Sequence, residues 1–83
     1  MNVLSISYSD DLLVATGQSA QELEHELRVL LAIKLFEVRR LSLGKAAELA
    51  GMSRIAFMDQ LGRNGVPVIN VDDDQIADEL RDA

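Results

Sequence analysis

The stretch from Leu41 to Leu61, LSLGKAAELAGMSRIAFMDQL, constrains the fold of this chain more than any other. It contains two short helical patterns separated by a single glycine, Gly51. A helix ends readily at such a glycine, because only glycine enters a left-handed backbone conformation without a steric penalty. Ser42 and Ser53 each stand where a serine hydroxyl caps the first turn of a helix. A helix, a short turn with glycine and a second helix together make the pattern of a helix-turn-helix.

The side chains of this stretch also predict how its two helices pack. The first helix has a face of small residues that another helix can approach closely; these are Ala46, Ala47 and Ala50. Met52 is placed to fill the core beneath the turn. The second helix, predicted over residues 54–61, is expected to be buried through Phe57 and Leu61.

A longer helix precedes the motif. Ser19 and Glu22 form a capping box, and the helix is predicted to run from Ala20 to about Arg40. One helical turn over residues 10–15, stopped at Gly17, is predicted before it. The main apolar stripe of the long helix consists of Leu23, Leu27, Leu30, Leu31, Leu35 and Val38. A second apolar set lies off this stripe and consists of Val29, Ile33 and Phe36.

This long helix is apolar on nearly all sides in the run VLLAIKLF, where only Lys34 is polar. A chain of 83 residues can cover one side of such a helix but hardly both. We therefore expect a homodimer or larger homo-oligomer. The residues expected at that interface are Leu31, Ile33, Leu35 and Phe36.

Two short segments have the pattern of β-strands. Val3 to Tyr8 alternates between apolar and polar residues, and the run VPVINV from Val66 to Val71 is the other strand candidate. A lone strand leaves its backbone groups unpaired, so the two strands should pair either within the chain or with a second copy. The predicted fold class is mostly α: a long amphipathic helix, a helix-turn-helix core, short N-terminal and C-terminal strands, and an acidic tail. Residues 1–65 form the folded domain, and residues 66–83 the extended segment and tail.

The composition argues against catalysis. The chain has no cysteine and one histidine, His25, which lies between two glutamates in the long helix and is expected to face solvent. The run Asp72-Asp73-Asp74 lacks the loop glycine and distal glutamate of a calcium-binding EF-hand, and no phosphate-binding glycine loop is present. We predict no enzyme activity, catalytic residue, metal, cofactor or small-molecule substrate. No apolar run is long enough to span a bilayer, which favours a cytoplasmic protein without membrane contact.

The charge distribution bears on nucleic-acid binding. The net charge is −6, but residues 25–65 carry seven bases and four acids, a net charge of +3 between acidic ends. The groove-facing positions of the second helix would be Ser53, Arg54, Ile55, Met58, Asp59 and Gly62. Arg54 suits a guanine or a phosphate, whereas Asp59 repels the DNA backbone. Arg39 and Arg40 can contact phosphate or simply stabilise the end of the long helix. The residues alone therefore leave two readings: a DNA-binding motif, or a helix-turn-helix used only for protein contacts.

The runs LSLGKAAELAGMSRIAFMDQL and NGVPVINVDDD, with the leucine-rich helix before them, resemble uncharacterised protein family 0175, a group of small bacterial and archaeal proteins. The resemblance extends over nearly the whole chain, and the segment from Ser42 to Phe57 is its most specific part. Members resemble antitoxins of type II toxin–antitoxin modules, usually paired with a PIN-domain-like ribonuclease toxin. The resemblance therefore implies transcription regulation through operator DNA and a C-terminal segment that holds the toxin.

The resemblance also implies roles for individual residues. The DNA-binding residues are then Lys45, Ser53, Arg54 and Arg63. The toxin-binding residues are Ile69, Ile76, Leu80 and Arg81. The favoured function is an antitoxin that neutralises a PIN-domain-like ribonuclease and binds its own promoter. The alternative is a helix-turn-helix adaptor that binds protein partners and no DNA.

Overall fold

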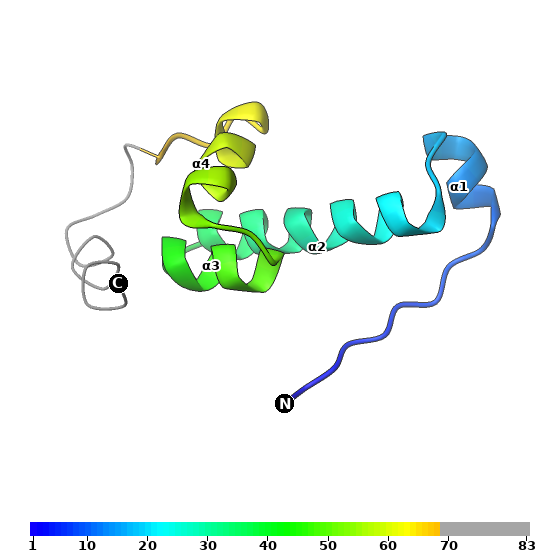
Figure 1. Ribbon diagram of the computed structural model, residues 1–83, viewed down its shortest axis with the longest axis horizontal. Helices are drawn as coiled ribbons and strands as arrows, with labels where there is room; N and C mark the ends of the chain where they lie inside the picture. The colour runs from blue at the N-terminus through cyan, green and yellow to red at the C-terminus, as the bar shows by residue number, and fades with distance from the viewer. Residues whose placement is uncertain (69–83) are drawn as a thin grey trace.

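The computed structural model of the chain describes residues 1–68. Helices make up most of this part: α1 (Asp11–Thr16), α2 (Ala20–Glu37), α3 (Leu43–Ala50) and α4 (Arg54–Arg63). Helix α2 is the longest, and α3 and α4 lie against its C-terminal half (Figure 1). Helix α1 and the extended residues 1–9 lie at its N-terminal end. The site-bearing part of the fold is therefore the three-helix unit α2–α4.

The start of α2 follows the predicted capping box. The Ser19 N–H donates to Glu22 Oε1 at 2.9 Å, and the Glu22 N–H donates to Ser19 Oγ at 3.2 Å. The helix ends at Glu37, slightly before the predicted end, because Arg39 turns the chain with a left-handed φ of 63°. The Arg40 N–H then donates to the Leu35 carbonyl at 2.8 Å, which closes the last turn. The single turn before α2 is also confirmed, and it ends at Gly17 with a φ of 69°.

The core lies where α2, α3 and α4 meet. It consists of Val29, Ala32, Ile33, Phe36, Leu43, Ala46, Ala47, Ala50, Phe57, Leu61 and Val66. The alanines of α3 face this core, as predicted from their spacing. Phe57 is fully buried, and its ring meets the ring of Phe36 edge to face with centroids 6.3 Å apart. This aromatic pair joins α2 directly to α4.

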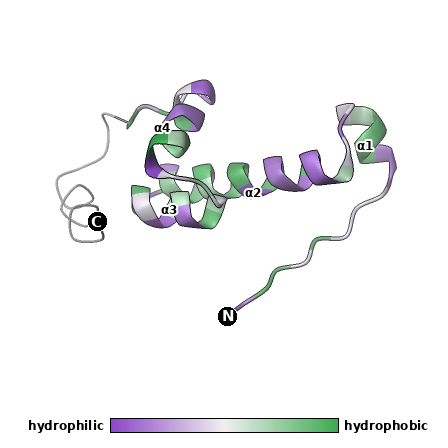
Figure 2. Cartoon of the chain, viewed as in Figure 1, coloured by the Kyte–Doolittle hydropathy of each residue, from purple (hydrophilic) through white to green (hydrophobic). Residues whose placement is uncertain are grey.

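Helix α2 uses one of its two apolar sides in this core. The smaller predicted set, Val29, Ile33 and Phe36, is buried together with Ala32. Leu30, Leu31 and Val38 of the main stripe stay 42%, 44% and 49% exposed. Figure 2 shows the corresponding change along α2, from a hydrophilic start to a hydrophobic C-terminal half. Leu30, Leu31 and Val38 therefore stay partly uncovered by the packing of the described residues, 1–68.

The predicted strands are wrong for the described residues. Residues 3–8 have an extended backbone but belong to no sheet, and residues 66–68 contain no strand either. The physical reason is the missing partner, since a strand forms only where a neighbour accepts and donates its backbone hydrogen bonds. Val66 instead closes α4: its N–H donates to the Leu61 carbonyl at 2.8 Å and its side chain is buried. Pro67 has no N–H to contribute to a ladder.

Several predictions concern residues 69–83, which lie outside the described residues. They are the toxin-contact residues Ile69, Ile76, Leu80 and Arg81, the acidic tail, and the remainder of the segment from Val66 to Val71.

Candidate nucleic-acid interface

The turn between α3 and α4 has the geometry that the sequence predicts. Gly51 ends α3 with a left-handed φ of 74°, and the Met52 N–H donates to the Ala47 carbonyl at 3.1 Å. Ser53 begins α4, and its Oγ accepts the Ala56 N–H at 3.1 Å. Ser42 caps α3 in the same way. Each helix of the motif therefore starts at a serine cap, and the glycine sets the angle between them.

Arg28 holds this turn from α2. Its Nε donates to the Leu49 carbonyl, one of the last of α3, at 2.6 Å. A Cβ placed on Gly51 would lie 3.2 Å from Arg28 Nη1, so the guanidinium group lies directly against the turn. A cation at the C-terminus of a helix is favoured by the helix dipole. Sequence reasoning missed Arg28, because a single arginine in mid-helix is no different from any solvent-facing residue until the tertiary contact is known.

Helix α4 presents its N-terminus and one side to solvent. The first backbone N–H groups of any helix lack intrahelical acceptors and favour anions, and Ser53 adds a hydroxyl that can donate to a phosphate oxygen. Arg54 follows as a half-buried residue, and Ile55 is 81% exposed. Met58 is exposed on the next turn. The surface thus combines groups that can bind phosphate with two apolar side chains.

Two of the predicted DNA-binding bases lie in ion pairs within their own helices. Arg63 Nε lies 2.7 Å from Asp59 Oδ2, and Lys45 Nζ lies 3.6 Å from Glu48 Oε2. Both pairs are largely exposed to solvent, where ion pairs contribute little to stability and break easily. The Asp59–Arg63 pair also reduces the repulsion that Asp59 alone would exert on a phosphate backbone.

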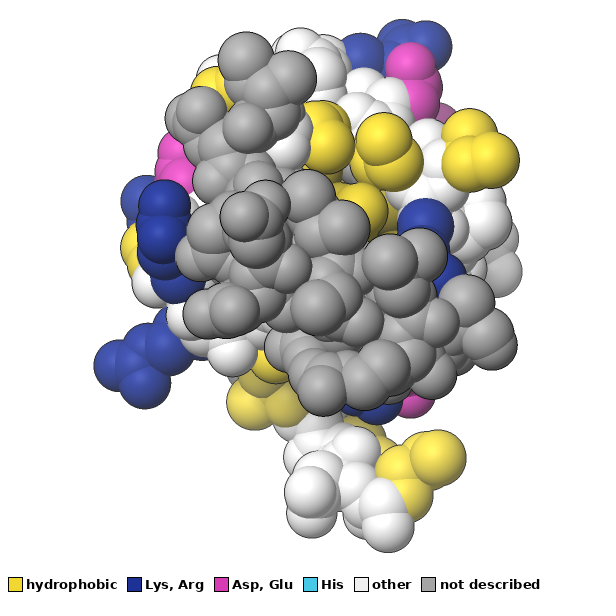
Figure 3. Space-filling view, turned by 90° about the vertical axis from the view of Figure 1, so that its left-hand side faces the viewer, with side chains coloured by type: hydrophobic (Ala, Val, Ile, Leu, Met, Phe, Trp, Pro, Cys, Tyr) yellow, Lys and Arg dark blue, Asp and Glu magenta, His cyan; other side chains and the backbone are white. Residues whose placement is uncertain are grey.

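Basic side chains gather at this end of the molecule. Figure 3 looks at the end that carries α3 and α4, and Lys and Arg side chains stand around its margin together with some Asp and Glu side chains and with hydrophobic side chains between them. The bases of the three-helix unit near this end are Arg39, Arg40, Lys45, Arg54 and Arg63. Of the four predicted DNA-binding residues, Lys45 lies on α3 and Ser53 in the turn, while Arg54 and Arg63 stand at opposite ends of α4.

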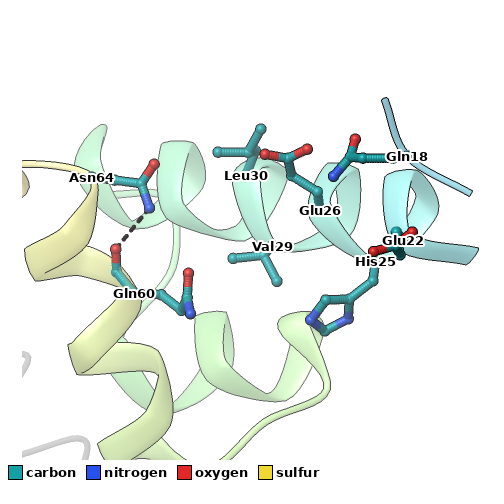
Figure 4. A pocket seen from close by; sticks show the side chains of 8 residues that line it. All are labelled: Gln18, Glu22, His25, Glu26, Val29, Leu30, Gln60 and Asn64. Carbon is teal, nitrogen blue, oxygen red and sulfur yellow. Dashed lines mark hydrogen bonds between the residues drawn. The ribbon is translucent and has the colours of Figure 1, made fainter. Parts of the chain in front are cut away.

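A groove of about 330 Å³ lies on another side, between α4 and the first half of α2. It is lined by Gln18, Glu22, His25, Glu26, Val29, Leu30, Gln60 and Asn64 (Figure 4). The Asn64 side chain donates to the Gln60 carbonyl at 2.8 Å, which fixes one wall. Because the acids Glu22 and Glu26 line the groove, it repels a nucleic acid rather than attracting one. His25 is exposed, as predicted, at the edge of this groove.

Two pKa shifts occur among the described residues, and both lie away from α3 and α4. The Ser19 backbone N–H and hydroxyl lower the pKa of Glu22, because hydrogen bonds to a carboxylate favour its charged form. The Tyr8 hydroxyl donates to Glu24 Oε2 at 2.5 Å, and this bond raises the pKa of Tyr8.

Within residues 1–68, no three acidic, histidine or cysteine side chains are grouped so as to hold a metal ion. No helix in the same range has the length and apolarity to cross a membrane.

The residues predicted for oligomerisation divide between the two sides of α2. Ile33 and Phe36 are buried in the core of their own chain. Leu31 is 44% exposed on the opposite side, and Leu35 is half-buried.

Comparison with known proteins places the chain in a family. The profile of the Uncharacterised protein family (UPF0175) matches residues 1–83. The chain belongs to this family. A UPF0175 protein of Aeropyrum pernix is 37% identical over 59 residues, which cover 71% of this chain and 65% of that protein. A UPF0175 protein of Archaeoglobus fulgidus is 38% identical over 60 residues, covering 72% of this chain and 68% of that protein. The match thus spans about two thirds of each relative, and no solved structure matches the chain.

Proposed function

We propose that this UPF0175 protein is an antitoxin-type regulator that binds its own promoter DNA through α3 and α4. In this proposal the N-terminus of α4 lies in the major groove, where Arg54 contacts a guanine or a phosphate. Ser53 and Lys45 contact phosphates, and Arg63 supports the backbone contact from the far end of α4. The residues beyond the three-helix unit hold a protein partner, a PIN-domain-like ribonuclease.

One observation carries the DNA-binding part: the N-terminus of α4 is exposed on a motif whose two helices are held by three separate contacts. Phe57 anchors α4 in the core, Gly51 sets the turn, and Arg28 ties the end of α3 to α2. A recognition helix needs such a support, because base contacts depend on a fixed angle of entry into the groove. The basic margin of the same surface supplies the nonspecific attraction to phosphates that precedes recognition.

The antitoxin part is supported by the sequence resemblance and by the charge separation along the chain. Residues 66–83 carry six acids and one arginine, so this segment would be repelled from DNA and is suited to a different partner. A regulator whose folded unit meets DNA while its tail meets a ribonuclease can hold both at once.

A second candidate function follows from a specific feature of α4. Ile55 is 81% exposed, and Asp59 lies on the same helix. An exposed isoleucine beside an acid suits a protein surface at least as well as a DNA groove. The motif would then act as an adaptor that binds a protein partner and no DNA.

Binding of the purified protein to the DNA upstream of its own gene distinguishes these candidates. Fluorescence anisotropy at fixed salt would compare this DNA with a shuffled sequence of the same composition. We expect the upstream DNA to be bound at least tenfold more tightly, and Arg54→Ala to remove most of that preference. Ile55→Ser should leave nonspecific binding unchanged. Equal, weak binding to both DNAs would support the adaptor.

The partner part has its own test. Deleting residues 72–83 should abolish protection of cells from the neighbouring ribonuclease while DNA binding persists. Full protection by the truncated protein at equal dose would contradict a toxin-binding tail.

A further inference from the structure

An asparagine followed by a glycine, Asn64-Gly65, stands directly after the last residue of α4. An asparagine side chain is lost when the backbone nitrogen of the next residue attacks its Cγ. Glycine in that next position leaves the approach open, because it has no side chain. The chain has three asparagines, and the other two, Asn2 and Asn70, are each followed by valine. Asn64 and Gly65 are both exposed to solvent, so burial does not protect them.

The reaction at such a pair is deamidation through a cyclic imide. The deprotonated Gly65 nitrogen forms a bond to Asn64 Cγ, and the side-chain NH2 takes up a proton and leaves as ammonia. Water then adds to one of the two imide carbonyls and breaks the bond between that carbonyl and the nitrogen. The product is either aspartate or isoaspartate, in which the backbone runs through the former side chain. Overall the chain loses NH3 and gains H2O, so no oxidant, reductant or cofactor is needed.

The backbone at the end of α4 keeps the two reacting atoms apart. The ψ angle of Asn64 is 11°, so the Gly65 nitrogen nearly eclipses the Asn64 nitrogen about the Cα–C bond. The five-membered imide ring closes only when the Gly65 nitrogen eclipses Cβ instead. The peptide group between the two residues must therefore rotate before the reaction can occur.

Hydrogen bonds oppose that rotation. The Gly65 N–H donates to the Gly62 carbonyl at 3.1 Å. The Asn64 side-chain NH2 donates to the Gln60 carbonyl at 2.8 Å (Figure 4). The Val66 N–H donates to another carbonyl of the same turn at 2.8 Å, and the Val66 side chain is buried. Attack on Cγ requires the Gly65 N–H to lose its proton and the side-chain amide to turn, so at least the first two bonds must break.

We propose that Asn64 is a deamidation site whose reaction rate is set by opening of the last turn of α4. Helix ends open locally at a low cost in free energy, so this turn opens without unfolding of the core. In the closed turn the Gly65 nitrogen and Cγ are held apart, and each opening allows them to meet. The inference is independent of DNA and partner binding, because the reaction needs only this chain and water.

The product of the reaction destabilises the closed turn. A carboxylate in place of the Asn64 amide has no N–H for the Gln60 carbonyl and places negative oxygens against it. It also adds a negative charge at the C-terminus of α4, where the helix dipole disfavours one. Isoaspartate lengthens the backbone by one carbon, which moves the Gly65 and Val66 N–H groups away from their acceptors. The added charge stands next to Arg63, so it also reduces the positive charge of the proposed DNA surface.

Peptide mass spectrometry of protein incubated at mildly alkaline pH measures the reaction. We expect Asn64 to deamidate at least tenfold more slowly in folded protein than in protein unfolded in guanidinium chloride. Asn2 is exposed but precedes valine, and it should remain intact in both states as the internal control. Equal rates at Asn64 in folded and unfolded protein would overturn the protection by the turn. An Asn64 as inert as Asn2 in unfolded protein would overturn the site itself.

Two variants separate local opening from global unfolding. Val66→Ala removes buried packing at the C-terminal end of α4, and Ser53→Ala removes the cap at its N-terminal end. Val66→Ala should speed deamidation of Asn64 at least fivefold, and Ser53→Ala less than twofold. Equal acceleration by both variants would show that global unfolding sets the rate and would overturn the local account.

Hydrogen exchange of the natural protein gives a measurement that needs no variant. The Gly65 amide should exchange at least tenfold faster than the amide of the buried Phe57, because the turn opens while the core stays folded. Equal protection of the two amides would contradict local opening. After deamidation, exchange at Gly65 and Val66 should become faster still, and unchanged exchange would contradict the destabilised turn.

Discussion

The same substitution at two glycines should change stability in opposite directions. Gly51 has a φ of 74°, and a Cβ there would lie 3.2 Å from Arg28 Nη1. Gly62 lies inside α4 with a helical backbone, and a Cβ there would meet no atom within 4 Å. The two sites therefore separate the effect of the backbone conformation from the general effect of replacing glycine by alanine.

The magnitudes follow from these geometries. An L-residue in the left-handed region costs about 1–2 kcal/mol. Displacing Arg28 also weakens its 2.6 Å hydrogen bond to the Leu49 carbonyl, which contributes about 1 kcal/mol. Gly51→Ala should thus lower the free energy of unfolding by about 1–3 kcal/mol. Gly62→Ala should raise it by about 0.5–1 kcal/mol, because alanine loses less backbone entropy in a helix.

Urea unfolding followed by circular dichroism measures both changes. All proteins should be compared at one concentration, because association with a second copy would add to the apparent stability. Adding Arg28→Ala should destabilise the Gly51→Ala variant less than it destabilises the natural protein, since the arginine contact is already disturbed. Similar losses for Gly51→Ala and Gly62→Ala would refute the left-handed turn as the origin of the effect.

Three further results are expected. Phe57→Ala should lower the free energy of unfolding by about 3–5 kcal/mol, because it leaves a cavity beside Phe36, and thermal unfolding will measure the loss. Ser53→Ala removes the cap of α4 and should cost about 1 kcal/mol in the same assay, whereas a neutral change would contradict the cap. The pKa of Glu22 lies below its ordinary value of 4.5, so the stability advantage over Glu22→Gln should be complete above pH 4.5. That advantage should disappear as the pH falls through the lowered pKa that Glu22 has in the folded protein. A stability difference from Glu22→Gln that persists in strong acid would exclude the capping box as its source.

The helices of this chain could be predicted from the sequence because their signals are local. Ser19, Ser42 and Ser53 cap helices through hydrogen bonds to residues three positions ahead, and Gly51 ends α3 through its own backbone. Each of these features depends on a few neighbouring residues, so their spacing alone was sufficient.

The features that sequence reasoning missed depend on contacts between distant segments. Arg28 contacts the α3 carbonyl 21 residues away, and nothing near it in the sequence indicates this. Periodicity indicates two apolar sides on α2 but not which side α3 and α4 cover, so the sequence alone predicts a single interface for both Ile33 and Leu31. The strand over residues 3–8 was predicted from alternation, but a strand also needs a partner, and the described part of a single chain supplies none.

The most direct test of DNA binding by the helix-turn-helix is the salt dependence of binding for two matched lysine variants. Lys45 and Lys34 are both exposed and both pair with a glutamate three residues ahead, but only Lys45 lies on the proposed DNA surface. A plot of the logarithm of the association constant for DNA against the logarithm of the salt concentration has a negative slope. Loss of one phosphate contact should reduce the magnitude of this slope by about 1 per subunit. Lys45→Ala should show that reduction, while Lys34→Ala should keep the slope of the natural protein. Equal slopes for all three proteins would contradict DNA binding through α3 and α4.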